Sequence, residues 1–296
     1  MADDFSKLRE MKYSGRALHR IVTIEDYYGV GYTLTGRSSP SQARRLKVGE
    51  KTGTIRVEAV TDDESLKRMF KINTVEELAK LKDEIAKGSP ALIYYPAIRP
   101  VKKENGDVTG IVASNGIQTD LIYSKFINLG AHGYTNPLDI LESAFDEPYI
   151  MYDPQYDRDI DVTSFEPDDP NFTSRINICL NLKYPNPFSF MSFSFMSISL
   201  GPDLSKTPHC ERGTVLSLPT YLGGNEKPRL LPFSGDLIES RMSYIMARDI
   251  CKCLYEAIGK PNPDDNNKVY RVAAAVMMVK PSGLETFVIN RADRGE

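Results

Sequence analysis

Residues 188–200 carry no charged side chain, and this uncharged stretch constrains the fold more than any other part of the chain. The pentapeptide Phe-Ser-Phe-Met-Ser occurs in it twice in succession, and apolar and hydroxyl side chains alternate as along a β-strand, with a slip of phase at Met191–Ser192. Such a strand aggregates when its edge is exposed, so it needs neighbouring strands and a covered face. The sequence therefore predicts a sheet that encloses this stretch.

Other segments predict further strands, because they are rich in apolar and β-branched residues between turn residues. The expected strands are residues 16–23, 30–35, 54–58, 91–97, 110–113, 173–182, 270–279 and 286–289. Residues 26–29 and the charged residues 102–107 are expected to be turns. No strand runs into a Gly-rich phosphate loop of the P-loop or dinucleotide-binding kind, which excludes two common nucleotide-binding folds.

Three segments have helical patterns. Residues 74–87 begin with Thr74 and have Glu77 three residues later, which is a capping-box pattern, and an apolar stripe at Val75, Leu78, Leu81 and Ile85 follows. Residues 136–144 and 236–258 are the other two expected helices. Residues 146–169, rich in Asp, Pro and Tyr, are expected to form a long ordered loop, and residues 261–265 a linker. Helices placed between runs of strands predict an α+β fold with layered sheets.

Composition limits the possible partners. The chain has 296 residues, 41% of them hydrophobic and 26% charged, which suits one large globular domain or two small ones. A formal net charge of −3 without a basic stripe argues against a nucleic-acid partner. The N-terminal residues lack a secretory pattern, and no apolar run is long enough to span a membrane, so we expect a cytoplasmic protein with no membrane partner. Four unpaired cysteines and only three histidines predict no metal site.

Residues 114–120, Ser-Asn-Gly-Ile-Gln-Thr-Asp, place neutral hydrogen-bonding side chains between two apolar runs. An Asn-Gly pair in this setting is a strong signal for a hairpin turn. Amide side chains also offer a donor and an acceptor together, which suits the recognition of a heterocycle or a carboxamide. Both interpretations stay open from this segment alone.

Four regions combine a polar or charged group with Gly, Pro or small residues at an expected strand end. They are residues 13–16 (Tyr-Ser-Gly-Arg), 36–39 (Gly-Arg-Ser-Ser), 94–97 (Tyr-Tyr-Pro-Ala) with 114–120, and 165–176, where Glu166 precedes Thr173-Ser-Arg-Ile176. In this order they resemble the archaeal-type IMP cyclohydrolase family and its bacterial IMP cyclohydrolase-like relatives. That family has Tyr-x-Gly-Arg, Gly-Arg-Ser, Tyr-Asn-Ala with Ser-Asn-Gly-x-Gln-Thr-Asp, and a glutamate before Thr-Pro-Arg-Ile.

The resemblance spans roughly residues 13–235, and it implies a single domain over residues 1–296 that includes the C-terminal helix and hairpin within 236–290. Two positions depart from the pattern. Pro96 replaces an asparagine and loses a side-chain amide, and Ser174 replaces a proline and loosens a turn. Residues 74–87 and 188–200 look like additions relative to the archaeal members.

The resemblance implies closure of 5-formamidoimidazole-4-carboxamide ribotide (FAICAR) to IMP with loss of water, the last step of de novo purine synthesis. Both reacting groups sit on one ring, so holding the reactive conformer supplies much of the acceleration, and the step requires no cofactor or metal. The protein must polarise the formyl oxygen, take a proton from the attacking nitrogen and protonate the departing hydroxide, for which Arg, Tyr and carboxylate side chains are suited.

We assign candidate roles on this basis and give, for the three catalytic candidates, the purely structural role that the same residue could have instead. Glu166 is the candidate general base, or else part of a solvated acidic loop; Tyr95 is a proton donor, or else a core tyrosine. Arg37 holds the 5′-phosphate or polarises a carbonyl, or else forms a surface salt bridge. The candidate substrate-binding residues are Arg16, Ser38, Asn115, Gln118, Thr119, Thr173 and Arg175.

The resemblance also implies a homo-oligomer and a four-layer αββα sandwich like that of the N-terminal nucleophile (Ntn) hydrolases. Two other functions stay open. An Ntn-type amidohydrolase needs a Ser, Thr or Cys at the chain start, which Met1-Ala2 does not offer and Ser14 offers only after cleavage. A non-catalytic protein that binds a purine ribotide is the other, and Pro96 and Ser174 are its signals.

Overall fold

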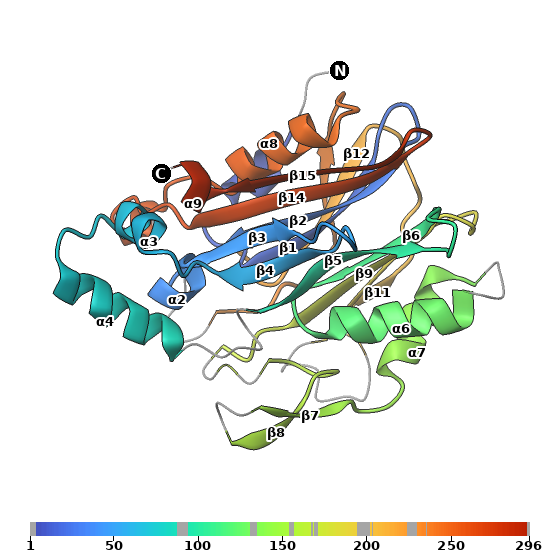
Figure 1. Ribbon diagram of the computed structural model, residues 1–296. Helices are drawn as coiled ribbons and strands as arrows, with labels where there is room; N and C mark the ends of the chain where they lie inside the picture. The colour runs from blue at the N-terminus through green and yellow to red at the C-terminus, as the bar shows by residue number, and fades with distance from the viewer. Residues whose placement is uncertain are drawn as a thin grey trace.

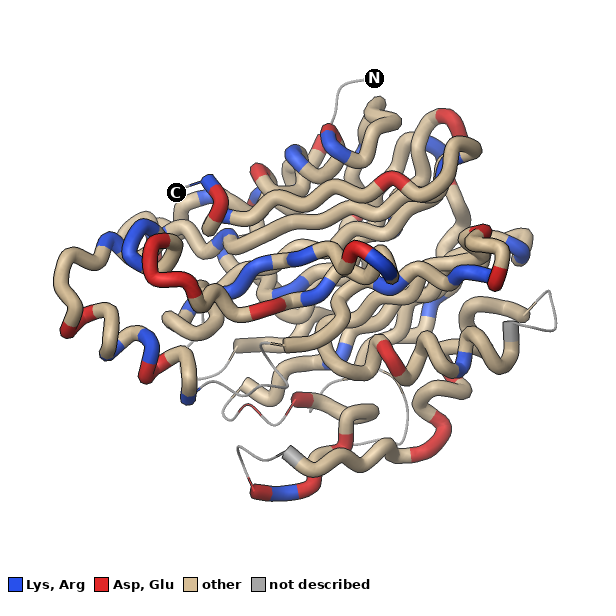
Figure 2. The backbone as a smooth tube through the Cα atoms, in the orientation of Figure 1, with Lys and Arg blue, Asp and Glu red and all other residues tan. Residues whose placement is uncertain are grey.

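Two large antiparallel sheets and the helices that pack on them make this a mixed α+β protein (Figure 1). The computed structural model describes residues 4–87, 94–130, 135–153, 157–166, 168, 171–193, 202, 204–223, 230–234 and 236–294. Basic and acidic residues are interspersed along the backbone (Figure 2). No helix in this described part is long and apolar enough to cross a membrane.

The first sheet has six strands in the order β13-β12-β1-β2-β14-β15. Their bounds are β1 Arg16–Val22, β2 Tyr28–Thr35, β12 Thr214–Pro219, β13 Ile238–Arg241, β14 Arg271–Lys280 and β15 Gly283–Asn290. Successive side chains of a strand point to opposite faces, and in β14 both sets are apolar. Ala273, Ala275 and Met277 belong to one apolar cluster, whereas Ala274 and Val276 belong to another. This sheet is therefore covered on both faces at β14.

The second sheet has seven strands in the order β11-β10-β9-β6-β5-β4-β3. Their bounds are β3 Arg44–Val48, β4 Ile55–Ala59, β5 Tyr95–Lys102, β6 Val108–Ser114, β9 Arg175–Asn181, β10 Phe188–Phe193 and β11 Leu204–Lys206. Pro96 lies opposite Arg56 at an irregularity of the β4–β5 register, where a missing N–H is tolerated.

The uncharged stretch lies inside this sheet, as predicted, for the part that the structure describes. Strand β10 pairs with β9 on one side and with β11 on the other. Phe188 and Phe190 enter one apolar cluster, and Met191 enters the cluster on the opposite face. The slip of phase at Met191–Ser192 therefore marks a strand with apolar contacts on both faces. Residues 194–200 lie outside the described residues.

One apolar cluster joins the two sheets, because Leu18 and Val30 of the first sheet share it with Ile111 and Ile178 of the second. The helices pack on the remaining faces. Helix α8 (Ala247–Ala257) and α1 (Ser6–Glu10) belong to a cluster with β14, whereas α6 (Gln118–Gly130) and α7 (Pro137–Phe145) belong to one with β6 and β9. Burial of each large apolar side chain contributes about 1.5–3 kcal/mol.

Two predicted helices are confirmed, and each begins after the N-cap residue expected from the sequence. Helix α4 (Val75–Ala86) begins after Thr74, whose hydroxyl and Glu77 form the expected capping box, and α7 begins after Asn136. Leu78, Leu81 and Ile85 are buried, but Val75 is 76% exposed and does not belong to the buried stripe. The remaining short helices are α2 (Ser39–Gln42), α3 (Asp63–Phe70), α9 (Arg291–Arg294) and the 3-10 helix η1 (Pro263–Asp265), which lies in the expected linker.

Three other predictions are wrong in part. Residues 236–258 are not one helix, because β13 pairs with β12 before α8 begins, and this long-range pairing overrides local helical propensity. Residues 146–169 are not all loop, since β7 (Ile150–Asp153) and β8 (Arg158–Asp161) form a two-stranded ribbon away from the two large sheets (Figure 1). The predicted strand 91–97 begins at Tyr95, and residues 91–93 lie outside the described part.

Candidate functional site

The sequence segments singled out above meet at one end of the second sheet. Strand β6 is antiparallel to both β5 and β9, so its end at Ser114, which pairs with Asn177, lies at the same end of the sheet as the starts of those strands, Tyr95 and Arg175. Arg16, the first residue of β1 in the other sheet, reaches the same place: its Nη1 donates to the backbone oxygen of Asn115 at 2.8 Å.

Glu166 lies at the centre of this site and is 0% exposed. Arg16 binds its carboxylate with two hydrogen bonds, from Nη1 to Oε1 at 2.9 Å and from Nη2 to Oε2 at 2.6 Å. Arg175 Nη1 donates to Oε1 as well, at 3.0 Å. A buried carboxylate is costly unless charged donors surround it, and here three N–H groups do so. The alternative of a solvated acidic loop is therefore wrong for Glu166.

The two arginines respond differently to this environment. Burial alone lowers the pKa of Arg16, but the adjoining Glu166 carboxylate raises that pKa well above its ordinary value. Burial lowers the pKa of Arg175, and the Glu166 carboxylate opposes that shift, while the charge of Arg16 adds to it. Because a guanidinium ordinarily titrates above pH 12, both side chains stay charged at neutral pH. Glu166 thus holds two cations together inside the protein.

The neutral polar run forms the turn from β6 into α6. It is therefore a strand-to-helix turn and not the hairpin turn of the structural alternative. Asn115 Nδ2 donates to the Ser174 oxygen at 2.6 Å, and Asn115 Oδ1 accepts from the Ile176 N–H and from Gln118 Nε2, both at 3.0 Å. These bonds tie the end of β6 to the start of β9. The Asn115 amide is accordingly engaged with the protein's own backbone.

Two neighbours of Asn115 complete this turn. Gln118 Oε1 accepts from Arg175 Nη1 at 3.3 Å, so it helps to hold the second arginine. Thr119 and Ser114 share a hydrogen bond of 2.5 Å between their hydroxyls. A Cβ atom at Gly116 would lie 2.4 Å from Arg175 Nη1 and 2.5 Å from Gln118 Oε1, which explains why a residue without a side chain stands there.

A second carboxyl group, Asp168, lies in the same loop as Glu166. Its oxygens accept from the Thr173 N–H and from the Thr173 hydroxyl, each at 2.6 Å, and that hydroxyl also lies 2.5 Å from the Tyr221 hydroxyl. Burial and the charge of Glu166 raise the pKa of Asp168 from 3.8 to about 6, although the bonds to Thr173 oppose the shift. Asp168 therefore exchanges its proton closer to neutral pH than an ordinary aspartate does.

Tyrosines line the surroundings of the charged cluster. Tyr95 is buried, as expected for the alternative that it is a core tyrosine. Its hydroxyl lies 2.8 Å from the Tyr32 hydroxyl. Tyr13 stacks on Tyr221 with ring centroids 5.7 Å apart. Burial raises the pKa of Tyr13 and of Tyr221, and burial together with Tyr95 raises that of Tyr32. These three phenols are therefore neutral at physiological pH and keep their O–H groups as hydrogen-bond donors.

The predicted residues Arg37 and Ser38 lie at the edge of this site. Arg37 is partly exposed in the loop after β2, with its guanidinium carbon 5.8 Å from the centroid of the Tyr13 ring. Ser38 is exposed and caps α2, where it and Ser41 form a capping box. No described hydrogen bond or ion pair joins either residue to Glu166. Arg37 is connected to the site through Tyr13, and Ser38 has a local structural task.

Two polar atoms of the site are buried without a hydrogen-bond partner among the residues that the structure describes. They are the Ser174 hydroxyl and the Nε of Arg175. Buried polar groups in native proteins are nearly always paired, so such atoms mark positions where a ligand or a water molecule completes the site. Ser174 is also one of the two positions that depart from the family pattern.

Sequence reasoning missed four residues of this site: Tyr13, Tyr32, Asp168 and Tyr221. Tyr13 belongs to the quoted Tyr-Ser-Gly-Arg segment and was therefore within reach, and Asp168 was counted among loop aspartates because its neighbours are acidic. Tyr32 and Tyr221 stand in strand-like surroundings and give no local signal. Among the described side chains, no group of three His, Cys, Asp or Glu is placed to hold a metal ion.

Comparison of the chain with models of known protein families and with curated protein sequences gives no match.

Proposed function

We propose that this protein is an IMP cyclohydrolase that closes FAICAR to IMP in the site around Glu166. One observation carries the proposal. Arg16, Asn115, Glu166 and Arg175 come from three of the four segments that resemble the family. They span 159 positions of the sequence and yet form one buried hydrogen-bonded cluster. Residues of these types suit the recognition of an anionic, amide-bearing ribotide.

The proposed phosphate position is the partly exposed edge of the site. Arg37 lies over the Tyr13 ring there, its backbone oxygen accepts from Lys268 Nζ at 3.4 Å, and Arg44 contributes to the electrostatic environment of Tyr13. Several cations around one aromatic ring suit a 5′-phosphate joined to a flat heterocycle. The reacting carboxamide and formamide groups would then lie deeper, toward Asp168 and Arg175.

The geometry also changes which carboxyl group suits the role of base. Both Glu166 oxygens already accept from guanidinium groups, so Glu166 serves best to orient Arg16 and Arg175. The Asp168 oxygens also accept hydrogen bonds, but from the neutral N–H and hydroxyl of Thr173, and the pKa of Asp168 is raised to about 6, so Asp168 suits proton transfer better. In the proposed reaction the carboxamide nitrogen bonds to the formyl carbon and gives its proton to Asp168. The formyl oxygen is polarised by Arg175 or Ser174 and gains one proton from a neutral tyrosine. Its C–O bond then breaks and it leaves as water with the proton held by Asp168, while the former formamide nitrogen forms the ring C=N bond and returns its proton to the tyrosine.

The finer architecture is part of the same proposal. A four-layer αββα sandwich like that of the Ntn hydrolases accords with an apolar cluster between the two sheets and one under the helices on each outer face. The related amidohydrolase function would need Ser14 as a freed nucleophile, and Ser14 is buried two residues before Arg16. We further propose that the enzyme is a homo-oligomer.

The test is to add FAICAR to purified protein without metal ions and to follow IMP formation by absorbance. Asp168→Asn is expected to lower kcat about 100-fold or more with little change in IMP affinity, and Arg37→Ala chiefly to weaken IMP binding. Asp236→Asn is the matched control, because Asp236 pairs with Lys206 at the surface and belongs to none of the four segments. If IMP forms no faster than in the uncatalysed background, the proposed enzymatic function is wrong. Tight IMP binding without turnover would instead establish the non-catalytic alternative.

A further inference from the structure

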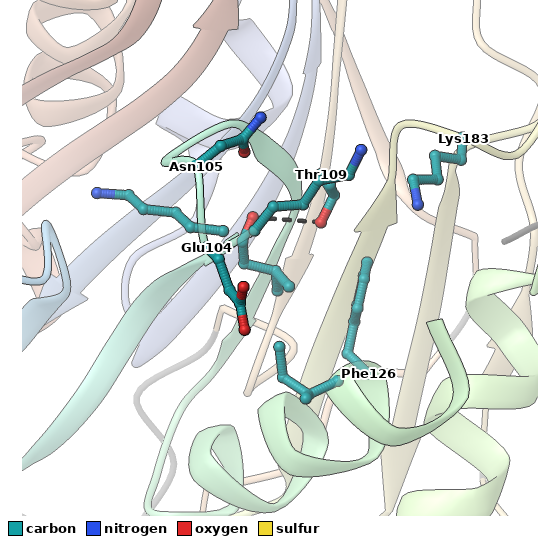
Figure 3. Close-up of a pocket in the computed structure, with 9 residues that line it drawn as sticks. Glu104, Asn105, Thr109, Phe126 and Lys183 are labelled. Carbon is teal, nitrogen blue, oxygen red and sulfur yellow. Dashed lines mark hydrogen bonds between the residues drawn. The ribbon is translucent and has the colours of Figure 1, made fainter. Parts of the chain in front are cut away.

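A separate pocket of about 560 Å³ lies at the opposite end of the β5–β6 hairpin (Figure 3). Strand β6 runs from Val108 beside this pocket to Ser114 at the charged cluster, six steps of about 3.4 Å or about 20 Å. The pocket is lined by Val101, Lys102, Lys103, Glu104, Asn105, Thr109, Phe126, Ile127 and Lys183. Its volume lies within the range of about 300–1,000 Å³ typical of small-molecule sites.

The floor of the pocket is apolar. Val101 of β5 and Phe126 of α6 are 2% and 3% exposed, and Ile127 beside them is 40% exposed although it is a large apolar side chain. In Figure 3 the ring of Phe126 stands on the helix, with Glu104 and Thr109 of the hairpin on one side and Lys183 on the other. The Thr109 hydroxyl is engaged with the Val101 oxygen at 3.4 Å. An apolar group of a ligand would contact Phe126 and Ile127.

The rim of the pocket is cationic. Three of its lining residues are lysines and one is a glutamate, which leaves a net charge of two positive units. Among the described residues no carboxylate forms an ion pair with Lys102, Lys103 or Lys183, whereas Lys82 and Lys206 elsewhere are paired with aspartates. Within the described part of the chain, the ammonium groups at this pocket therefore have no ion-pair partner that a ligand would have to displace.

We propose that this pocket binds an organic anion with an apolar body, of the size of a medium-chain carboxylate. The apolar chain would lie on Val101, Phe126 and Ile127, and the anionic head would face the lysines. Asn105 would not take part in recognition, since its amide donates to Asp107 at 2.7 Å and accepts from the Asp107 N–H at 3.1 Å. The inference stands independently of the proposed function, because the two sites share no lining residue.

Three probes test it by isothermal titration calorimetry with the full chain. Octanoate offers an apolar body and a charge, octan-1-ol the body alone, and inorganic phosphate the charge alone. Octanoate is expected to bind with one-to-one stoichiometry and at least about tenfold more tightly than either other probe, because it alone satisfies both the floor and the rim. Equal affinity for octanoate and octan-1-ol, tighter binding of phosphate, or no binding of octanoate would each overturn the proposal.

Substitutions of the lining residues test whether octanoate binds in this pocket, because some should weaken its binding and one should strengthen it. Lys102→Gln and Lys183→Gln are each expected to weaken octanoate binding about threefold, and Glu104→Gln to strengthen it about threefold. Ile127→Ser is expected to weaken octanoate and octan-1-ol alike. Lys80→Gln on helix α4 is the matched control and is expected to change nothing. All these positions are partly or fully exposed, so the variants should fold, and the same affinity in all of them would overturn the assignment to this pocket.

Discussion

The two ends of strand β6 carry charge in opposite ways. At the Ser114 end, Arg16, Glu166 and Arg175 are almost fully buried and bound to one another. At the Val108 end, Lys102 and Lys183 line an open pocket and form no ion pair among the described residues. A buried charge requires partners and is costly to disturb, whereas an exposed charge costs little to remove. The first end is therefore a preorganised site, and the second keeps its charges available to a ligand.

The two ends also differ in how the chain assembles them. The charged cluster joins residues 16, 115, 166 and 175, which come from both large sheets and a loop. The pocket draws most of its lining from one hairpin, residues 101–109, and one turn of α6. Long-range assembly means that each side chain of the cluster supports several others. Substitutions at the two ends should separate these properties.

Glu166→Ala should produce the largest loss of stability, because it leaves Arg16 and Arg175 buried without their counter-ion. Removing one partner of a buried charge pair typically costs about 3–5 kcal/mol. Glu104→Ala at the pocket is the matched control, and it should change the free energy of unfolding by less than about 0.5 kcal/mol, as exposed substitutions usually do. Urea denaturation measures both variants. Equal losses in the two would show that burial does not distinguish the ends.

Asp168→Asn should alter how stability depends on pH. The native pKa of Asp168 is raised from 3.8 to about 6, so the folded protein binds more protons than the unfolded chain between pH 4 and 6. The folded protein therefore loses stability as pH rises through this window, by up to about 2–3 kcal/mol, and Asp168→Asn should remove that loss. The stability of the variant relative to the unaltered protein should thus increase from pH 4 to pH 6.5.

Asp236→Asn is the control for the sign of that effect. Lys206 lowers the pKa of the exposed Asp236 carboxyl, so its contribution is present at neutral pH and is lost as pH falls. Its variant should therefore become relatively less stable as pH rises, the reverse of Asp168→Asn. Thermal unfolding from about pH 2.5 to pH 7 measures both, because the Asp236 effect develops below about pH 4 and the Asp168 effect between about pH 4 and 6. The same sign in the two variants would contradict the assignment of a raised pKa to Asp168.

Local signals in the sequence were enough for much of the fold. The capping box of Thr74 and Glu77 determines its own helix start, and the strands on either side of residues 26–29 and 102–107 pair through short turns. In contrast, residues 238–241 form a strand because β12, more than twenty residues earlier, offers an edge to pair with. No periodicity within the segment carries that information, so a helix was predicted across it.

The same distinction applies to the site. The residue types and their order in the sequence identify the polar run and the arginines as candidates. They do not predict which of these side chains contact one another. Arg16 was counted only among the candidate substrate-binding residues, yet it binds Glu166 across 150 positions. Asp168 differs from other loop aspartates because it is partly buried and lies close enough to Glu166 for that charge to raise its pKa. Pairing and burial are properties of the folded chain, and single-residue patterns do not contain them.

Gly116→Ala should have an intermediate effect, because the new Cβ atom would meet Arg175 Nη1 at 2.4 Å inside the cluster. Overpacking of this kind costs about 1–3 kcal/mol. Gly106→Ala in the β5–β6 hairpin is the comparison: nothing lies within 4 Å of its Cβ position, but its φ of +90° disfavours a side chain, which costs about 1 kcal/mol. Gln118→Ser, added to each variant, should reduce the stability loss of Gly116→Ala in part and leave the loss of Gly106→Ala unchanged. Urea denaturation of the single and double variants measures both differences.

Replacing Lys102 and Lys183 together by glutamine should have the smallest effect on stability. Neither ammonium group has an ion-pair partner among the described residues, so the free energy of unfolding should change by less than about 0.5 kcal/mol. Any change at low ionic strength should be a slight gain, because repulsion with Lys103 is relieved, and it should vanish in 1 M salt, where screening acts over about 3 Å. A loss above about 1 kcal/mol would show that these lysines stabilise the fold as the buried arginines do, and their availability to an anionic ligand would then have no basis.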